Sequence, residues 1–550
     1  MRGLGVGLAA CLVGASAVGC GGGMLGAGAP RAGTDGAVTS PDAVASGPVV
    51  SRVEPDASAE AHDAGVAGRD AGATSGDAAI IRASEGPAQS IPLDPNLPPG
   101  ICPAPPPGLR LIAPISASTV TAARPRHRWV ADAGATTEIQ ICGDRACSSV
   151  LWQTTTGATQ TAPDVDLPPG YWFWRARSAD QPDASWTWSW LFRVRRRAAG
   201  YAPLANTAAE LFTDYNGDGF PDVVVRRTGN DAQAEVLLGG PHGPSATRVI
   251  PIAAYAGLGV DLNGDGFSDL VVPQQPMTAQ GSGWIAQIEL GGPQGLSPDG
   301  FITAALPPYP LPAGAPVGLG DVDGDGFGDL IWPLRYNAFL FHGCAGGPAP
   351  GPWQAVVSEQ DVDTPMSGDF NGDGLADFTY GSSPGFYAYL GGPGTLSSIE
   401  TDPVVEPQGL VVDANYDGYS DAIGPTNVGP WVTQSMLLGG PGGLAPTAVA
   451  LSSWPLAFGD FDGDGLWDAL IEATCPDDTC SPASYQVAYG APGTWGTSFS
   501  HVASAPRGTV VDLNADGYDD LIAPDGDGGV AYYAGSPAGL PATPTSTFQL

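Results

Sequence analysis

The sequence predicts an all-β protein: a seven-bladed β-propeller, preceded by a β-sandwich and a disordered N-terminal tether. Three observations predict this fold. An aspartate-rich loop of nine residues occurs seven times in the last 350 residues, and short strand-like runs separate its copies. The chain also has 80 glycines and 55 prolines, which favour turns over helices. A repeat of about 50 residues built from strands is typical of a propeller, in which four strands make one blade.

The aspartate-rich loop has the composition of a calcium site. Its clearest copy, residues 321–329, reads Asp-Val-Asp-Gly-Asp-Gly-Phe-Gly-Asp. Every copy has acidic or amide side chains at positions 1, 3, 5 and 9, and glycine at position 6, where a sharp turn needs a positive φ. Ca²⁺ takes six to eight oxygen ligands, which these side chains and the carbonyl of residue 7 can supply. Thiols and imidazoles are absent from the loops, which argues against zinc, copper and iron.

We therefore expect about seven Ca²⁺ ions, each clamping one turn and stabilising the fold. An EF-hand is excluded because position 12 of the first copy is Val225 and not Glu. The predicted ligands, with the residue at position 7 contributing its carbonyl oxygen, are Asp214, Asn216, Asp218, Phe220, Asp222, Asp261, Asn263, Asp265, Phe267, Asp269, Asp321, Asp323, Asp325, Phe327, Asp329, Asp369, Asn371, Asp373, Leu375, Asp377, Asp413, Asn415, Asp417, Tyr419, Asp421, Asp460, Asp462, Asp464, Leu466, Asp468, Asp512, Asn514, Asp516, Tyr518 and Asp520.

The N-terminus predicts export. Residues 1–19 have a short basic start and an apolar run, as in a secretory signal peptide. Ala17-Val-Gly-Cys20 resembles the lipobox of bacterial lipoproteins, although Ala17 replaces the usual Leu or Val. That resemblance implies lipidation of Cys20, a membrane anchor, and a place at the cell surface or on the periplasmic side of the outer membrane. The alternative is cleavage after Ala15-Ser-Ala17, which would give a secreted protein.

Residues 20–100 are rich in Ala, Gly, Asp, Ser and Pro, with almost no aromatic residues. Such a segment cannot bury enough apolar surface to fold, so we expect a disordered linker. The formal net charge of the chain is −36. A nucleic-acid partner is excluded because a basic footprint is missing.

Residues 101–199 read as a β-sandwich, because strand-like runs at 109–112, 127–130, 138–142, 171–177 and 188–194 alternate with Pro/Gly turns. Trp129, the run Tyr171-Trp-Phe-Trp-Arg-Ala-Arg177 and the closing Trp-Ser pair resemble a fibronectin type III domain. The tryptophans at 186, 188 and 190 leave two interpretations open, namely core packing or an exposed glycan or protein site.

The cysteines fit an oxidising compartment. Cys142 and Cys147 flank four residues, as do Cys475 and Cys480, and both spacings suit a hairpin disulfide. For Cys102 and Cys344 two alternatives remain, namely a disulfide bond between them or two free thiols.

Residues 200–550 resemble the FG-GAP (VCBS-type) repeats of integrin α chains and bacterial surface proteins. The resemblance is carried by the Asp-x-Asp/Asn-x-Asp-Gly-x-x-Asp loops and by the Leu-Gly-Gly-Pro turns, such as residues 238–241. It implies a seven-bladed propeller and calcium at the loop residues named above. Tyr416 and Ala515 depart from the pattern, since they replace glycine at position 4.

The sequence predicts a monomeric, calcium-binding surface protein, a cell adhesion or binding module for a protein or glycan. A lectin is the alternative, and a calcium-dependent polysaccharide-acting enzyme is a weaker one. We expect no enzyme, because the histidines of the repeats, His242, His342 and His501, read as surface or turn residues. The Gly-x-Ser-x-Gly pattern at 381–385 lies between two strands, where a nucleophile elbow is not expected.

Overall fold

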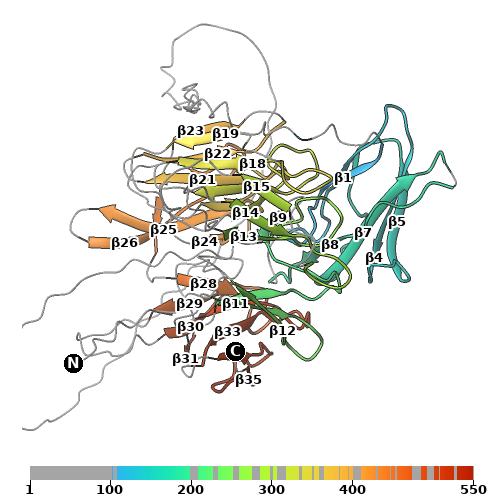
Figure 1. The fold of residues 1–550 in the computed structure, drawn as a ribbon. Helices are drawn as coiled ribbons and strands as arrows, with labels where there is room; N and C mark the ends of the chain where they lie inside the picture. Colours follow the sequence, from blue (N-terminus) through green and yellow to red (C-terminus); the bar gives the residue numbers. More distant parts are fainter. Residues whose placement is uncertain are drawn as a thin grey trace, which may run out of the picture. The chain divides into compact units, whose positions relative to one another are not determined.

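The structure is a computed structural model in which every defined element is a β-strand (Figure 1). The predicted all-β class is therefore confirmed for the part of the chain that the structure describes. That part holds no helix long and apolar enough to cross a membrane. The described residues are 102, 108–181, 183–198, 208–226, 233–251, 259–274, 285–297, 302–305, 317–333, 337–349, 352, 354–357, 365–382, 385–393, 396–400, 410–428, 431–445, 448–451, 455–472, 485–491, 501–506, 508–525 and 529–548.

Two sheets built mainly from residues 108–198 bury a common core. A three-stranded sheet has the order β1-β3-β6, and a six-stranded sheet has the order β5-β4-β7-β8-β2-β9. Trp129 of the first sheet and Ile139, Trp174 and Phe192 of the second belong to one buried cluster. The strands are β1 (Arg110–Ala113), β2 (Ser118–Val120), β3 (His127–Val130), β4 (Thr137–Cys142), β5 (Val150–Thr156), β6 (Gln160–Thr161), β7 (Gly170–Ser178), β8 (Trp190–Val194) and β9 (Ala208–Leu211).

Seven small antiparallel sheets follow, each attached to one aspartate-rich loop. Their strand orders follow the sequence, so each sheet is a simple meander. The strands are β10 (Val223–Arg226), β11 (Gln233–Leu238) and β12 (Ser245–Pro251); β13 (Leu270–Gln274), β14 (Ile285–Glu289) and β15 (Ile302–Ala305); β16 (Val317–Gly320), β17 (Asp329–Pro333), β18 (Asn337–Phe341) and β19 (Gln354–Val357); β20 (Met366–Gly368), β21 (Asp377–Ser382), β22 (Gly385–Leu390) and β23 (Ser397–Glu400); β24 (Leu410–Val412), β25 (Asp421–Val428), β26 (Trp431–Leu437) and β27 (Ala448–Ala450); β28 (Pro455–Gly459), β29 (Asp468–Glu472), β30 (Tyr485–Tyr489) and β31 (His501–Ala505); and β32 (Thr509–Val511), β33 (Asp520–Pro524), β34 (Val530–Tyr533) and β35 (Ser546–Phe548).

The first two sheets have three strands each, where four were predicted. The strand expected to enter their loops is reduced to single bridges, Thr213 with Asp222 and Val260 with Asp269. The strand that precedes the first loop, β9, pairs antiparallel with β2 of the six-stranded sheet instead. Leu211 at the end of β9 packs against the core of that sheet and against the core between the second and third repeat sheets.

Each repeat sheet is buried on both faces, because successive residues of a strand point to opposite sides. On β17, Leu330 and Trp332 lie in the core shared with the second sheet, while Ile331 lies in the core shared with the fourth. The run Val223-Val-Val225 divides in the same way between the second and the seventh sheet. A sheet covered on both faces explains why these strands read as continuous apolar runs rather than as alternating ones.

The order of neighbouring sheets is cyclic. Buried clusters join the first sheet to the second, the second to the third, and so on to the sixth and seventh. A further cluster joins the seventh sheet back to the first, with Leu513, Ile522 and Tyr532 packed against Val223 and Leu237.

Candidate metal-binding loops

The glycine at position 6 closes every loop onto its first aspartate. Its backbone N–H donates to the position-1 carboxylate over 2.8–3.1 Å in all seven copies. These glycines have φ between 83° and 93°, a conformation that a side chain makes costly. The conformation predicted for position 6 is therefore found in every loop.

Position 4 needs a positive φ as well. The five glycines there have φ of 70–77°, and Tyr416 and Ala515 adopt 61° and 54°. The next loop explains the preference for glycine: a Cβ on Gly217 would lie 2.3 Å from the ring of Phe267, at position 7 of the second loop. The departures at Tyr416 and Ala515 thus leave two L-residues in the left-handed region.

Positions 3, 5 and 7 are linked by two further hydrogen bonds. The Oδ1 atom at position 3 accepts the N–H of position 5 over 2.9–3.1 Å in every copy. The Oδ1 atom at position 5 then accepts the N–H of position 7 over 2.7–3.1 Å. The loop backbone thus orients the predicted ligands at positions 1, 3 and 5 through its own N–H groups.

The aspartate at position 9 joins the loop to the body of its sheet. One carboxylate oxygen accepts the N–H of position 2. The other accepts the N–H of a glycine that follows the next-but-one strand, the strand paired with the one that leaves the loop, and all these bonds measure 2.7–3.0 Å. These seven aspartates are at most 2% exposed. The sequence did not indicate this second bond, although the recurring Leu-Gly-Gly turn marks its donor. The donors are Gly239, Gly291, Gly343, Gly391, Gly439, Gly490 and Gly535.

The buried carboxylates of a loop oppose one another's ionisation. Burial, and next the charge of Asp265, raise the pKa of Asp261 to about 8. Burial also raises the pKa of Asp421 and of Asp468 to about 8, with the other carboxylates of each loop adding to the shift. A divalent cation bound among these oxygens would lower the pKa values of the carboxylates again, because a positive charge favours their ionised form.

The donor sets suit a hard cation, since they offer mainly carboxylate and amide oxygens. In the third loop, Asp321, Asp323 and Asp325 place one oxygen each within 4.8 Å of one another, and Asp460, Asp462 and Asp464 do the same in the sixth. Oδ1 of Asp460 is buried and has no hydrogen-bond partner among the described residues. A buried charged oxygen without a donor is costly unless an ion satisfies it, so the residues present fit Ca²⁺.

Neighbouring loops are bonded to each other through position 8, a position that the sequence did not mark. The N–H of Ser268 donates to the carbonyl of Asp214, while its hydroxyl accepts the N–H of Asp214. Ser420 makes the same pair of bonds with Asp369. Asp519 repeats the arrangement toward Asp460 with its carboxylate. The first and second, the fourth and fifth, and the sixth and seventh loops are therefore bonded in pairs rather than standing as isolated turns.

Several arginines from residues 108–198 bind to the aspartate-rich loops. Arg145 donates to the carbonyls of Gly217 and Gly266 over 2.7 and 2.6 Å, so it spans the first two loops. Arg128 donates to the carbonyl of Asp373 over 2.7 Å, and Arg110 donates to that of Asp325. Arg193 pairs with Asp519 over 2.7 Å. These cations lie opposite the acidic loops.

A disulfide bond joins Cys102, which precedes β1, to Cys344 in the third repeat. This bond decides between the two alternatives left open for these residues. Cys142 is bonded to Cys147, as the spacing predicted. Cys20, Cys475 and Cys480 lie outside the described residues.

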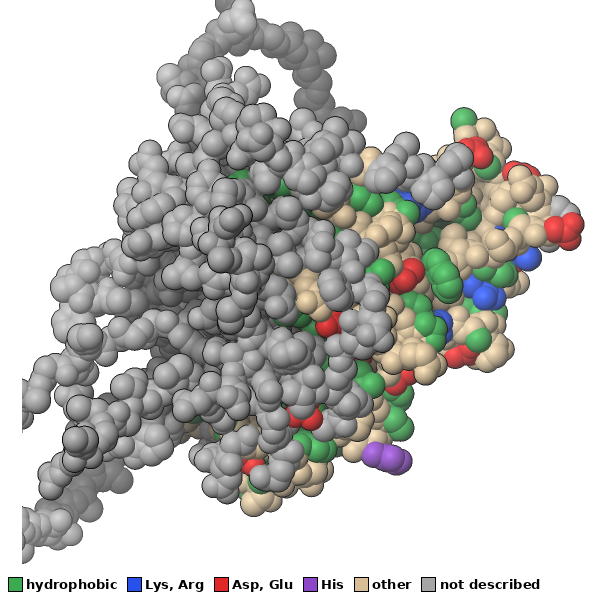
Figure 2. Space-filling view, in the orientation of Figure 1, with side chains coloured by type: hydrophobic (Ala, Val, Ile, Leu, Met, Phe, Trp, Pro, Cys, Tyr) green, Lys and Arg blue, Asp and Glu red, His purple; other side chains and the backbone are tan. Residues whose placement is uncertain are grey.

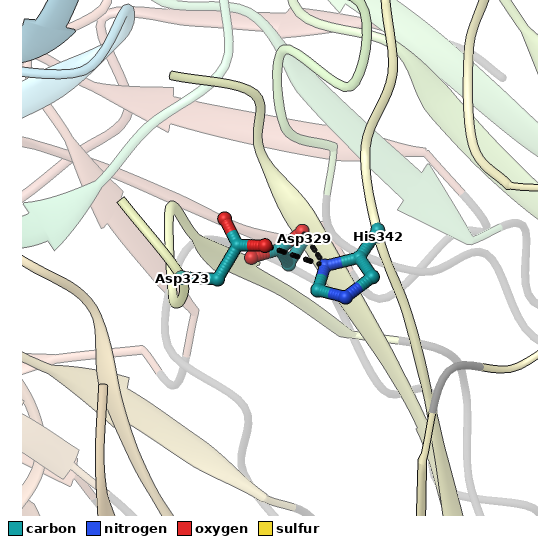
Figure 3. A group of neighbouring side chains, drawn as sticks. All are labelled: Asp323, Asp329 and His342. Carbon is teal, nitrogen blue, oxygen red and sulfur yellow. Dashed lines mark ion pairs between the residues drawn. The ribbon is translucent and has the colours of Figure 1, made fainter. Parts of the chain in front are cut away.

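The third loop has a neighbour, His342, that was expected to be a surface or turn residue. Figure 3 shows His342 with its ring directed at Asp323 and Asp329. Its Nδ1 atom lies 3.1 Å from Oδ2 of Asp323 and 3.5 Å from Oδ1 of Asp329. His242 is exposed, and the side chain of His501 lies outside what the structure describes.

The three tryptophans at 186–190 have different surroundings. Trp190 is buried at 2% exposure, whereas Trp188 is 62% exposed. Trp186 contacts two guanidinium groups, those of Arg175 and Arg177, each 4.4 Å from its ring centre. Basic side chains on the face in Figure 2 gather over the region of β4, β5 and β7. Of the two interpretations left open for these tryptophans, core packing applies to Trp190 and an exposed position applies to Trp188.

Comparison with known proteins gave structural neighbours alone. No protein-family profile matches the chain, and no curated protein is similar to it. An Agrocybe aegerita lectin, described as recognising non-reducing terminal N-acetylglucosamine, is similar over 71% of this chain and 93% of its own, with 15% identity and a TM-score of 0.35. Bacillus licheniformis rhamnogalacturonan lyase PL11 is similar over 78% of this chain and 91% of its own, with 12% identity and a TM-score of 0.28.

Proposed function

We propose that this protein is an exported, calcium-stabilised binding protein of the FG-GAP (VCBS-type) repeat class, with one Ca²⁺ in each of its seven loops. The observation that carries the proposal is the repetition of one hydrogen-bonded loop, in which the glycine at position 6 closes onto the aspartate at position 1 in every copy. Calcium is structural: it neutralises buried carboxylates whose ionisation the bare loop disfavours.

The proposed architecture is a seven-bladed β-propeller. The cyclic order of the shared cores supports it, because a radial array of seven sheets gives each sheet two neighbours. The hydrogen bond from Gly240 to the carbonyl of Leu513 supports it as well, since it joins the first and last repeats. We further propose that residues 101–199 form a fibronectin type III-like sandwich, in line with their two sheets around one core.

Calcium at extracellular concentration would add substantially to the free energy of unfolding. With a dissociation constant near 10⁻⁴ M, about 1 mM Ca²⁺ adds roughly 1.4 kcal/mol per site to the free energy of unfolding. Seven such sites would add about 10 kcal/mol, which is comparable with the stability of a whole domain. The acidic loops thus make the fold dependent on a calcium-rich compartment, in agreement with the export signal read from the sequence.

We propose that the protein is anchored through lipidated Cys20 and presents its folded part beyond a linker as a non-enzymatic adhesion module. The side chains at positions 1, 3, 5 and 9 of the first loop accept backbone N–H groups, which favours a metal role over acid–base catalysis. A glycan ligand is the second candidate. The exposed ring of Trp188 favours it, since aromatic faces are common in ligand sites.

A glycan array probed with the calcium-loaded chain and with Trp188→Ala separates the two partner classes. Binding to a defined group of glycans that Trp188→Ala abolishes would assign a lectin. An array without binding would favour a protein partner. Turnover of any polysaccharide on a panel of substrates would overturn the non-enzymatic proposal.

A further inference from the structure

His342 occupies a register position that belongs to apolar or aromatic residues in the other six repeats. It directly precedes Gly343, whose N–H donates to Asp329 at position 9 of the third loop. The residue before the corresponding glycine is Leu238, Leu290, Leu390, Leu438, Tyr489 or Ala534 in the other repeats. At this position of the sequence, the third repeat is therefore the one that has an imidazole.

The third loop is also unusually acidic. It has aspartate at position 3, where five of the seven copies have asparagine. The extra carboxylate, Asp323, is the group that faces the imidazole, with Nδ1 and Oδ2 3.1 Å apart. Nδ1 itself is shielded from solvent. Figure 3 shows both aspartates on the same side of the ring, so that one nitrogen and two carboxylate oxygens face a common point.

We propose that the third loop takes Zn²⁺ in place of Ca²⁺ when zinc is present, with Nδ1 of His342 joining the carboxylates of Asp323 and Asp329, which would otherwise hold the calcium ion. The three donor atoms lie within 4.8 Å of one another. Two ligands of a tetrahedral ion at about 2.0–2.1 Å lie roughly 3.4 Å apart, and the nitrogen–oxygen distances here are 3.1 and 3.5 Å. An imidazole with carboxylates suits zinc, whereas Ca²⁺ takes oxygen ligands alone.

Two features of the third repeat hold this donor set in place. Asp329 is fixed by the N–H groups of Val322 and Gly343, which accounts for its orientation toward the imidazole. Cys344, two residues after His342, is bonded to Cys102 and donates its N–H to the carbonyl of Leu262. The segment is thus tied down at the two residues that directly follow His342, as a preorganised ligand requires.

The inference shares its loop with the proposed calcium function, so both metals have to be measured in one experiment. The full chain is titrated with Zn²⁺ by calorimetry in saturating Ca²⁺, and with Co²⁺ followed by its visible absorption. We expect one zinc ion per chain, bound at least about tenfold more weakly by His342→Gln, with loss of the tetrahedral cobalt spectrum. His242→Gln, which changes an exposed histidine, is the matched control and should bind zinc like the wild type.

Asp323→Asn gives a second variant that leaves the loop intact, because asparagine is the common residue at position 3. It should also weaken zinc binding. Two results would overturn the inference: equal zinc binding by the wild type and both variants, or no zinc binding at all. His342 would then form only an ion pair with Asp323 and Asp329. Calcium binding by the other loops is read separately: its absence with zinc retained would refute the calcium proposal and keep this one.

Discussion

The N–H of Gly240, in the first repeat, donates to the carbonyl oxygen of Leu513, in the seventh loop, over 3.0 Å. The equivalent bond joins Gly292 to Tyr215, Cys344 to Leu262, Gly392 to Val322, Gly440 to Phe370 and Ser536 to Phe461. Each bond connects one repeat to the loop of the preceding repeat. The bond from Gly240 runs from the first repeat to the last, so it belongs to the same series and makes the series cyclic.

Gly239→Ala should therefore destabilise the chain by about 2–4 kcal/mol, as a clash with fixed backbone does. A Cβ there would lie 2.2 Å from the carbonyl of Pro221 and 2.7 Å from that of Leu513. Gly240→Ala is the control, because its Cβ would meet its nearest atom at 3.7 Å. Urea denaturation of the two variants measures the difference. Equal stability of the two variants would contradict the close packing of Gly239 against the carbonyls of Pro221 and Leu513.

Ala515→Gly should stabilise the protein by roughly 1 kcal/mol, since it relieves an L-residue held at φ 54°. Gly463→Ala, at the same position of the sixth loop, should do the reverse, as its Cβ would lie 2.3 Å from the ring of Tyr518. Thermal unfolding of both variants in calcium tests the pair. A lower melting temperature for Ala515→Gly would contradict the loop geometry described above.

Asp468→Ala should destabilise the protein with or without calcium. It leaves the buried N–H groups of Phe461 and Gly490 without an acceptor, at about 1–3 kcal/mol each. Asp464→Ala in the same loop removes an exposed carboxylate that accepts a single backbone N–H, that of Leu466, so its main effect on stability should appear when calcium is present. Melting curves in calcium and in chelator separate the two effects. If both variants behave alike in chelator, position 9 has no structural role of its own.

Without calcium, stability should fall as the pH rises from 5 to 8. The pKa values of Asp261, Asp421 and Asp468 are raised to about 8 in the folded state, against about 3.9 in the unfolded chain. Between these values the folded state binds more protons, so its stability is lost as they dissociate. Calcium replaces those protons, and its stabilising effect should grow over the same interval. Urea denaturation midpoints of the calcium-free protein at pH 5 and pH 8 test this. A higher midpoint at pH 8 than at pH 5 would contradict the prediction.

The repeats and their loops could be predicted because their signals are local. Asp321 and its partners lie within nine residues, and their spacing alone orients them. The contacts of Asp329 with Gly343 and of Asp214 with Ser268 could not be predicted, since they join residues far apart in the chain. The pairing of β9 with β2 was missed for the same reason.

The role of His342 was within reach of the sequence. Aligning the Leu-Gly-Gly turns of the repeats places it in register with Leu238 and Leu438. His342 lies outside the nine loop residues, so the loop pattern alone does not mark it as a neighbour of the site. The fold brings that side chain back to the loop because Gly343, its neighbour, is bonded to Asp329.

Calcium stoichiometry tests the central claim most directly. Calorimetric titration of the chelator-treated full chain, with melting curves in calcium and in chelator, should give about seven bound ions and a large calcium-dependent rise in melting temperature. The loops already share one hydrogen-bonded geometry, so their ions should stabilise a single unfolding transition. An absence of calcium binding together with an unchanged melting temperature would show that the loops are turns only, and would contradict the account.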